Sequence, residues 1–168
     1  HSFPTRRSSD LVLKQAGVML AFKNTLLVGL SGRLSGLDPN TGVIRWESAI
    51  ATPRGTNDVE RLVDLVSPFD RVGDVVCVRA FQAAVGCVNA ERGQGVWTRP
   101  SAGEMGVSGN DTVLIAPLSN GVVQAWSRST GERLWETERL KYRILSAPLV
   151  TPRGVLVADN GGWLYLLS

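Results

Sequence analysis

Three carboxylates within one short segment, Asp64, Asp70 and Asp74, have the residue type and spacing for acid/base chemistry. Two carboxylates whose pKa values differ can act as a general acid and a general base. Arginines neighbour these residues in the sequence, and the segment has the composition of a surface insertion. We therefore expect solvated ion pairs of small energetic value here, and we predict no catalytic residue.

Cys77 and Cys87 are the only cysteines, and they fall on the two arms of one expected hairpin. A two-residue turn at Gln82-Ala83 would place Cys77 opposite Val88, with the two thiols on opposite faces of the sheet. The tip carries no glycine, which favours a longer or bulged turn, and a bulged turn would allow a disulfide in an oxidising compartment. We favour unpaired thiols. Without CxxC spacing or histidine, the pair gives little support to a metal site.

The run DPNT at 38–41 contains side-chain oxygens of the kind that also occur in calcium loops. The run occupies a turn position of a repeated unit, where Asp38, Asn40 and Thr41 can bond their own backbone, so we predict turn formers. The only histidine, His1, lies in the opening segment. No histidine therefore remains for general base catalysis or a metal site, and we predict neither a metal nor a cofactor.

The opening eleven residues, HSFPTRRSSDL, resemble one reading frame of a sequencing adapter joined to the gene. We expect residues 1–11 to be disordered and exclude them from the fold. Residues 12–168 then carry 16 basic and 14 acidic side chains, a net charge of +2, which gives little electrostatic footprint for nucleic acid. A start methionine, a signal peptide and an apolar run of ~18 residues are missing, and the chain stops within an expected strand. We interpret it as an internal fragment.

One pattern occurs three times, as SGRLSGLDPNTGVIRW at 31–46, QAAVGCVNAERGQGVW at 82–97 and NGVVQAWSRSTGERLW at 120–135. In each copy a glycine precedes a tryptophan by four residues, and apolar runs typical of strands flank tight turns. A four-stranded unit that repeats at about 40 residues is typical of a propeller blade. We predict an all-β chain that forms a partial β-propeller of four-stranded antiparallel blades, about three and a half in number.

We place the predicted blades near residues 17–50, 64–100, 103–138 and 144–168, with an interblade insertion at 51–66 and a fourth blade that lacks its outer strand. Two-residue hairpin turns are expected at three glycine-containing tips, Ser31-Gly32, Asn120-Gly121 and Gly161-Gly162.

The insertion contains apolar residues at helical spacing behind two candidate capping residues, Asn57 and Asp58. The residues at this spacing are Val59, Leu62, Val63 and Val66. A short helical turn and an irregular loop are the two alternative predictions for this segment.

The tryptophans at the repeated position, Trp46, Trp97 and Trp135, are expected to pack as wedges between blades. Trp126 and Trp163 fall on inner return strands, where exposure to a central channel is the alternative to packing. We favour packing.

The repeat, in which Leu37, Asp38, Thr41, Gly42 and Trp46 fit best, resembles the pyrroloquinoline-quinone-type propeller repeat, which implies a fold and not a function. The run RGTNDVERLVDLVSPFDRVGDVV and the later KYRILSAPLVTPRGVLVADNGGWLYLL resemble the BamB family of the outer-membrane β-barrel assembly machinery (BAM). The likeness covers essentially everything after residue 11.

In that family an eight-bladed propeller without known chemistry holds the POTRA domains of BamA through two interblade loops. The Leu-x-Leu-Arg pattern of one loop falls on 11–14, with Lys14 in place of an arginine and without its bidentate fork. The Arg-Leu-x-Asp-x-Asp pattern of the other matches 61–66, with Val66 at the second aspartate. The resemblance implies a protein-binding set of Leu13, Lys14, Glu60, Arg61, Leu62 and Asp64, with Asp58 as a further neighbour.

The resemblance thus implies a non-catalytic periplasmic scaffold lipoprotein, associated with the outer membrane, whose partners are the BamA POTRA domains, the BAM complex and unfolded outer-membrane proteins. A quinoprotein dehydrogenase built on the same repeat is the enzymatic alternative, although no clustered Asp/Glu/Asn set is evident in this segment. A third alternative is a cytosolic interaction platform with WD40-like architecture, but the repeat ends in T-G-x-x-x-W and lacks the G-H and W-D pairs.

Overall fold

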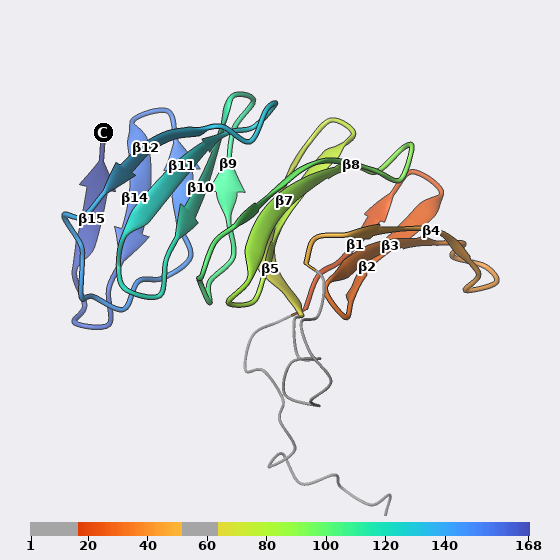
Figure 1. Ribbon diagram of the computed structural model, residues 1–168, viewed down its shortest axis with the longest axis horizontal. Coiled ribbons are helices and arrows are strands. Elements are labelled where there is room, and N and C mark those ends of the chain that lie inside the picture. Colours follow the sequence, from red (N-terminus) through yellow and green to blue (C-terminus); the bar gives the residue numbers. More distant parts are fainter. Residues whose placement is uncertain (1–16, 52–63) are drawn as a thin grey trace, which may run out of the picture.

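The computed structural model describes residues 17–51 and 64–168, which form fifteen β-strands and no helix (Figure 1). The strands make four antiparallel sheets, each a meander in chain order. The first sheet contains β1 (Met19–Phe22), β2 (Thr25–Leu30), β3 (Arg33–Leu37) and β4 (Ile44–Ala49), and the second contains β5 (Leu65–Val72), β6 (Val75–Ala80), β7 (Ala84–Asn89) and β8 (Gln94–Pro100). The third contains β9 (Ser108–Gly109), β10 (Val113–Pro117), β11 (Val123–Ser127) and β12 (Arg133–Thr137), and the three-stranded fourth contains β13 (Leu149–Thr151), β14 (Gly154–Ala158) and β15 (Leu164–Leu167).

The four sheets stand side by side in a row, like part of a fan (Figure 1). Strand β9 contacts both β5 and β13, so the first strands of neighbouring sheets adjoin one another. This is the radial stacking of propeller blades, and the predicted all-β partial propeller is confirmed.

The middle strands of the second and third sheets are buried on both faces, because each of these two sheets packs between two neighbours. Every residue of β6 after Val75 is buried, and so is every residue of β7 before Asn89. A strand in this position needs a continuous apolar run, and the sequences VVCVRA and AVGCVN have that character. The outer strand β12 is largely exposed.

Three apolar clusters fill the spaces between successive sheets. Between the first two sheets, Phe22, Leu27 and Leu34 pack with Val76 and Val78. Similar clusters lie between the second and third sheets and between the third and fourth. Each fully buried side chain of this size stabilises the fold by about 1.5–3 kcal/mol.

The repeated tryptophan of one sheet packs against the repeated glycine of the next. A Cβ atom at Gly93 would lie 2.3 Å from Cγ of Trp46, and one at Gly131 would lie 2.5 Å from Cδ2 of Trp97. Both glycines have positive φ, 68° and 71°. These positions therefore need glycine for two reasons: the backbone is left-handed, and a side chain would clash with the tryptophan ring.

Trp135, the third member of the series, does not follow the wedge prediction, since 40% of its surface is exposed. The three-stranded fourth sheet presents no glycine turn of this type to it within the described residues. Trp126 is buried, as favoured, with its ring centroid 6.3 Å from that of Trp97. Trp163 was predicted to pack, but it lies in the turn before β15 and is 68% exposed.

The hairpin tips differ from the prediction at two of three places. Leu30 pairs with Arg33, so Ser31-Gly32 is a two-residue turn with both φ angles positive. The tips at 118–122 and 159–163 are longer. In each the residue before the turn pairs with the residue after it, and the last turn residue, Gly121 or Gly162, has positive φ. A single left-handed glycine as the last of three turn residues fits this longer turn.

The predicted insertion ends earlier than residue 66. Val66 belongs to β5 and is 1% exposed, so it does not continue a helical pattern. Asn57, Asp58, Val59, Leu62 and Val63 lie outside the described residues, as does the opening segment at 1–11.

Candidate protein-binding face

A four-stranded meander places its turns alternately at two ends, which gives the partial propeller two faces. One face is built by the segments that join successive sheets, 101–107 and 138–148, and by the turn between the second and third strands of each sheet. We call it the interblade face. The opposite face carries the other turns, including the glycine turns that receive Trp46 and Trp97.

Of the six residues predicted to bind a partner, Asp64 alone is described; Leu13, Lys14, Glu60, Arg61 and Leu62 lie outside the described residues. Asp64 is half-buried and directly precedes β5. Its backbone carbonyl accepts a hydrogen bond of 2.8 Å from the N–H of Phe81, in the β6–β7 turn. The structure therefore places Asp64 on the interblade face, and its carboxylate makes no ion pair with the described residues.

The β6–β7 turn continues this contact toward the third sheet. The backbone N–H of Gln82 donates to the carbonyl of Gly103 at 2.8 Å, and its side-chain Nε2 donates to Oε1 of Glu104 at 2.8 Å. Oγ of Ser119, in the β10–β11 turn, donates to Oε1 of Gln82 at 3.2 Å. Hydrogen bonds thus connect Asp64 to the third sheet across the face.

A buried arginine in β6 holds the 101–107 segment in place through hydrogen bonds. Arg79 in β6 is fully buried, and its guanidinium donates to the carbonyls of Met105 at 2.7 Å, Ser101 at 3.0 Å and Pro117 at 2.6 Å. Burial lowers the pKa of Arg79 to about 10, and the group stays protonated at neutral pH. Its carbonyl partners supply the hydrogen bonds that a buried cation requires. The sequence signal for this clamp was an arginine within the apolar run of β6, and sequence reasoning missed it.

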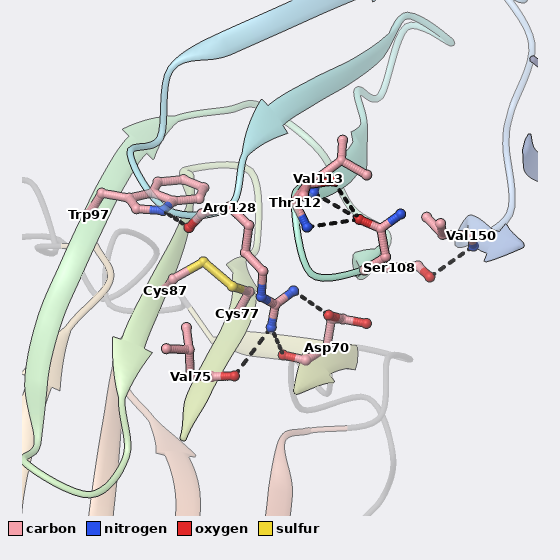
Figure 2. Close-up of polar contacts among 11 residues, drawn as sticks. Asp70, Val75, Cys77, Cys87, Trp97, Ser108, Thr112, Val113, Arg128 and Val150 are labelled. Atoms are coloured by element: carbon pink, nitrogen blue, oxygen red, sulfur yellow. Dashed lines mark hydrogen bonds and ion pairs between the residues drawn. A yellow bond between two sulfur atoms is a disulfide. The ribbon is translucent and has the colours of Figure 1, made fainter. Parts of the chain in front are cut away.

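A second buried arginine joins the second and third sheets near the opposite face (Figure 2). Nη1 of Arg128 donates to Oδ2 of Asp70, and Nη2 donates to the carbonyl of Val75 at 3.2 Å. The Arg128 and Asp70 side chains are only 5% and 17% exposed. The expectation of a solvated pair at Asp70 was therefore wrong, because Asp70 lies in β5 against the next sheet. Trp97 adds a bond from Nε1 to the carbonyl of Arg128 at 2.7 Å.

Cys77 and Cys87 form a disulfide, against the expectation of unpaired thiols. The β6–β7 turn has three residues, so Ala80 pairs with Ala84 and Cys77 falls opposite Cys87, with the Cα atoms 4.0 Å apart. Both cysteines are fully buried and lie beside Arg128 (Figure 2). The longer turn, which the missing glycine indicated, is the physical reason for the pairing.

The other candidate carboxylates have structural partners. Oδ1 of Asp38 accepts the N–H groups of Asn40 at 2.8 Å and Thr41 at 3.2 Å, which confirms the turn prediction. The Asn40 N–H and the Arg45 guanidinium lower the pKa of Asp38. Asp74 lies 3.7 Å from Nζ of Lys23 in an exposed pair. No cluster of three or more potential metal ligands occurs in the described ranges. In the same ranges no helix is long and apolar enough to cross a membrane.

Residues 2–137 match the family described as outer membrane protein assembly factor BamB. The match includes most of the opening segment that we interpret as adapter-derived. Similar curated proteins are the outer membrane protein assembly factors BamB of Bordetella pertussis, 32% identical over 97% of this chain, and of Legionella pneumophila, 33% identical over 95%. The chain spans only 43% and 42% of their respective lengths.

The fold has a counterpart among solved structures. The crystal structure of BamB from Moraxella catarrhalis superposes with a TM-score of 0.78 at 23% sequence identity, covering 90% of this chain and 49% of that one. At this level of identity the similarity supports the propeller fold. The partial coverage agrees with part of a larger propeller.

Proposed function

The chain belongs to the family of outer membrane protein assembly factor BamB, and from this premise we propose that its parent protein is a non-catalytic scaffold lipoprotein of the BAM complex. The interblade face would hold the POTRA domains of BamA. The proposed contact set is Leu13, Lys14, Glu60, Arg61, Leu62 and Asp64.

The observation that carries this proposal is the position of Asp64 on a hydrogen-bonded surface. Its backbone is fixed by Phe81, while its carboxylate has no ionic partner among the described residues. A backbone position that is fixed before binding loses little conformational entropy when its side chain meets a partner. An arginine or lysine of a POTRA domain has the charge to pair with it.

We propose a periplasmic location on the outer membrane. The buried Cys77–Cys87 disulfide supports it, because disulfides persist in oxidising compartments such as the bacterial periplasm. The proposal includes a lipid anchor on the parent protein, and unfolded outer-membrane proteins are proposed as further partners.

The test uses the full-length parent protein and purified BamA POTRA domains. The double substitution Arg61→Ala, Asp64→Ala is expected to weaken binding by at least about tenfold, since truncation of a hot-spot residue costs about 2 kcal/mol or more and about 1.4 kcal/mol corresponds to a tenfold change. Asp74→Ala is the matched control, because Asp74 is an exposed carboxylate on the opposite face. Unchanged affinity of the double variant would remove the proposed site. The scaffold proposal also expects no dye-linked dehydrogenase turnover with added quinone and calcium, the activity that the quinoprotein alternative requires.

A further inference from the structure

The Cys77–Cys87 disulfide lies in the junction between the second and third sheets, beside Arg128 (Figure 2). Both cysteines are 0% exposed, although they sit on the two strands of a single hairpin. The third sheet and the segment before it contribute four residues to the apolar cluster around the pair, which are Val107, Leu114, Ala116 and Trp126. All four follow Cys87 in the chain, so the disulfide is covered only once the third sheet has docked on the second.

Specific contacts across the junction hold this cover in place. The Arg128 guanidinium pairs with Asp70 and donates to the carbonyl of Val75 at 3.2 Å. The Trp97 ring packs on Gly131, and its Nε1 donates to the carbonyl of Arg128 at 2.7 Å. A reagent therefore reaches the sulfur atoms only when these contacts break and the two sheets separate. An opening of this size is rarely populated in a native protein.

The hairpin aligns the two cysteines without help from the third sheet. They are only ten residues apart, and the segment between them contains the whole β6–β7 turn. The pairing of Ala80 with Ala84 after this turn sets the register that places Cys77 opposite Cys87. Directly opposite residues of an antiparallel pair lie close enough for their side chains to touch. The two thiols therefore meet in the open hairpin, before the third sheet covers them.

The chemistry of disulfide exchange requires direct contact between the cysteine and its oxidant. A thiolate attacks a disulfide sulfur and forms a mixed disulfide, so the rate depends on access to the attacking sulfur. Cysteines that are buried in apolar surroundings are unreactive. A protein-sized oxidant in particular has no path to Cys77 or Cys87 once the third sheet has docked. Oxidation therefore has to come before docking.

We propose that a thiol–disulfide oxidoreductase oxidises Cys77 and Cys87 while the third sheet is undocked, and that docking then shields the bond from reductants. One thiolate of the pair attacks the disulfide of the oxidoreductase and forms a mixed disulfide. The second thiolate attacks the cysteine sulfur of that mixed disulfide, which forms the Cys77–Cys87 bond and releases the oxidoreductase as a dithiol. Two electrons and two protons pass from the cysteines to the oxidoreductase. The reaction does not depend on the Asp64 contact.

The order of oxidation and docking is measured while the reduced full-length protein refolds with a thiol–disulfide oxidoreductase in its disulfide form. Acid quenching at successive times, followed by alkylation and mass spectrometry of the peptides that carry Cys77 and Cys87, gives the oxidised fraction. A short pulse of dithiothreitol before the quench gives the fraction that is already shielded. The oxidised fraction should rise first and the shielded fraction later. Bonds that are shielded from the moment they appear would overturn the proposal.

Reduction of the folded protein tests the shielding. Dithiothreitol should leave the bond intact in the native protein and cleave it in guanidinium chloride. Asp70→Ala removes the carboxylate partner of Arg128 and should make reduction at least about tenfold faster, because the junction opens more often. Gly131→Ala, which disturbs the Trp97 contact in the same junction, gives a second measurement if the first variant does not fold.

Asp74→Ala is the matched control, because Asp74 is an exposed carboxylate outside the junction, and its bond should be as resistant as that of the wild type. Reduction of the native wild type as fast as that of Asp70→Ala would overturn the proposal.

Discussion

The junction between the second and third sheets is fixed by several specific contacts, whereas the junction between the third and fourth relies mainly on apolar packing. The first junction contains the Trp97–Gly131 contact, the Arg128–Asp70 pair and the Arg79 clamp. The second contains an apolar cluster and a bond of 3.0 Å from the N–H of Val150 to Oγ of Ser108. One repeat therefore gives junctions with unequal numbers of specific contacts, because Arg79, Asp70 and Arg128 lie outside the repeated pattern and the fourth sheet presents no glycine turn to Trp135 within the described residues.

Two of the three tryptophans at the repeated position, Trp97 and Trp135, test this difference most strongly. Trp97→Ala should lower the free energy of unfolding by about 3–5 kcal/mol, the range for a buried large aromatic side chain. Trp135→Ala should lower it by less than about 1 kcal/mol, because Trp135 is 40% exposed. Urea unfolding of both variants measures the contrast, and equal losses would contradict it.

The Arg128–Asp70 ion pair between the second and third sheets gives the next largest expected effect. Asp70→Ala leaves the Arg128 cation buried without its carboxylate and should lower the free energy of unfolding by about 3 kcal/mol. Asp74→Ala, at an exposed pair, should change it by less than about 1 kcal/mol. Losses of similar size in chemical denaturation would show that Asp70 is solvated after all.

The glycine turns allow the backbone requirement and the tryptophan contact to be separated. Gly131→Ala should lower the free energy of unfolding by about 2 kcal/mol or more, since the new Cβ meets both a positive φ and the Trp97 ring. At Gly42 φ is 73° and the space around a Cβ is open, so Gly42→Ala should lower it by only about 1 kcal/mol. If both variants have the same thermal midpoint, the contact between the Trp97 ring and Gly131 adds nothing to the cost of the substitution.

A smaller, pH-dependent effect is expected in the fourth sheet, at the turn between β14 and β15. The N–H of Trp163 and the hydroxyl of Tyr165 lower the pKa of Asp159 below its usual 3.8. A lowered folded-state pKa stabilises the protein above 3.8 and ceases to do so as the pH falls through the folded-state value. Asp159→Asn should therefore be less stable than the wild type at neutral pH, and the gap should narrow in acid. A gap in the urea midpoint that is constant with pH would contradict the assignment.

The sequence predicted the features that recur with the repeat and missed those that occur once. The strands, the Asp38 turn and the packing of Trp46 and Trp97 against the glycine turns of the next sheets follow from local patterns. The Arg128–Asp70 pair joins residues 58 positions apart on different sheets, and no local spacing indicates it. The register of β6 and β7 was predictable only in part. The missing glycine indicated a longer turn, but the pairing of Cys77 with Cys87 depends on that turn having three residues and not two.

The candidate site was predictable only through family resemblance. Asp64 lies on the interblade face, but nothing in its local sequence distinguishes it from Asp70, whose side chain is 17% exposed and pairs with Arg128.

The most direct test of the central claim is site-specific photocrosslinking in living cells, with a photoreactive residue at Gln82 or at Glu91 of the full-length protein. Both positions are exposed; Gln82 lies on the interblade face and Glu91 on the opposite face. The account predicts crosslinks from Gln82, and not from Glu91, to the POTRA domains of BamA. Crosslinks from Glu91 alone would contradict it.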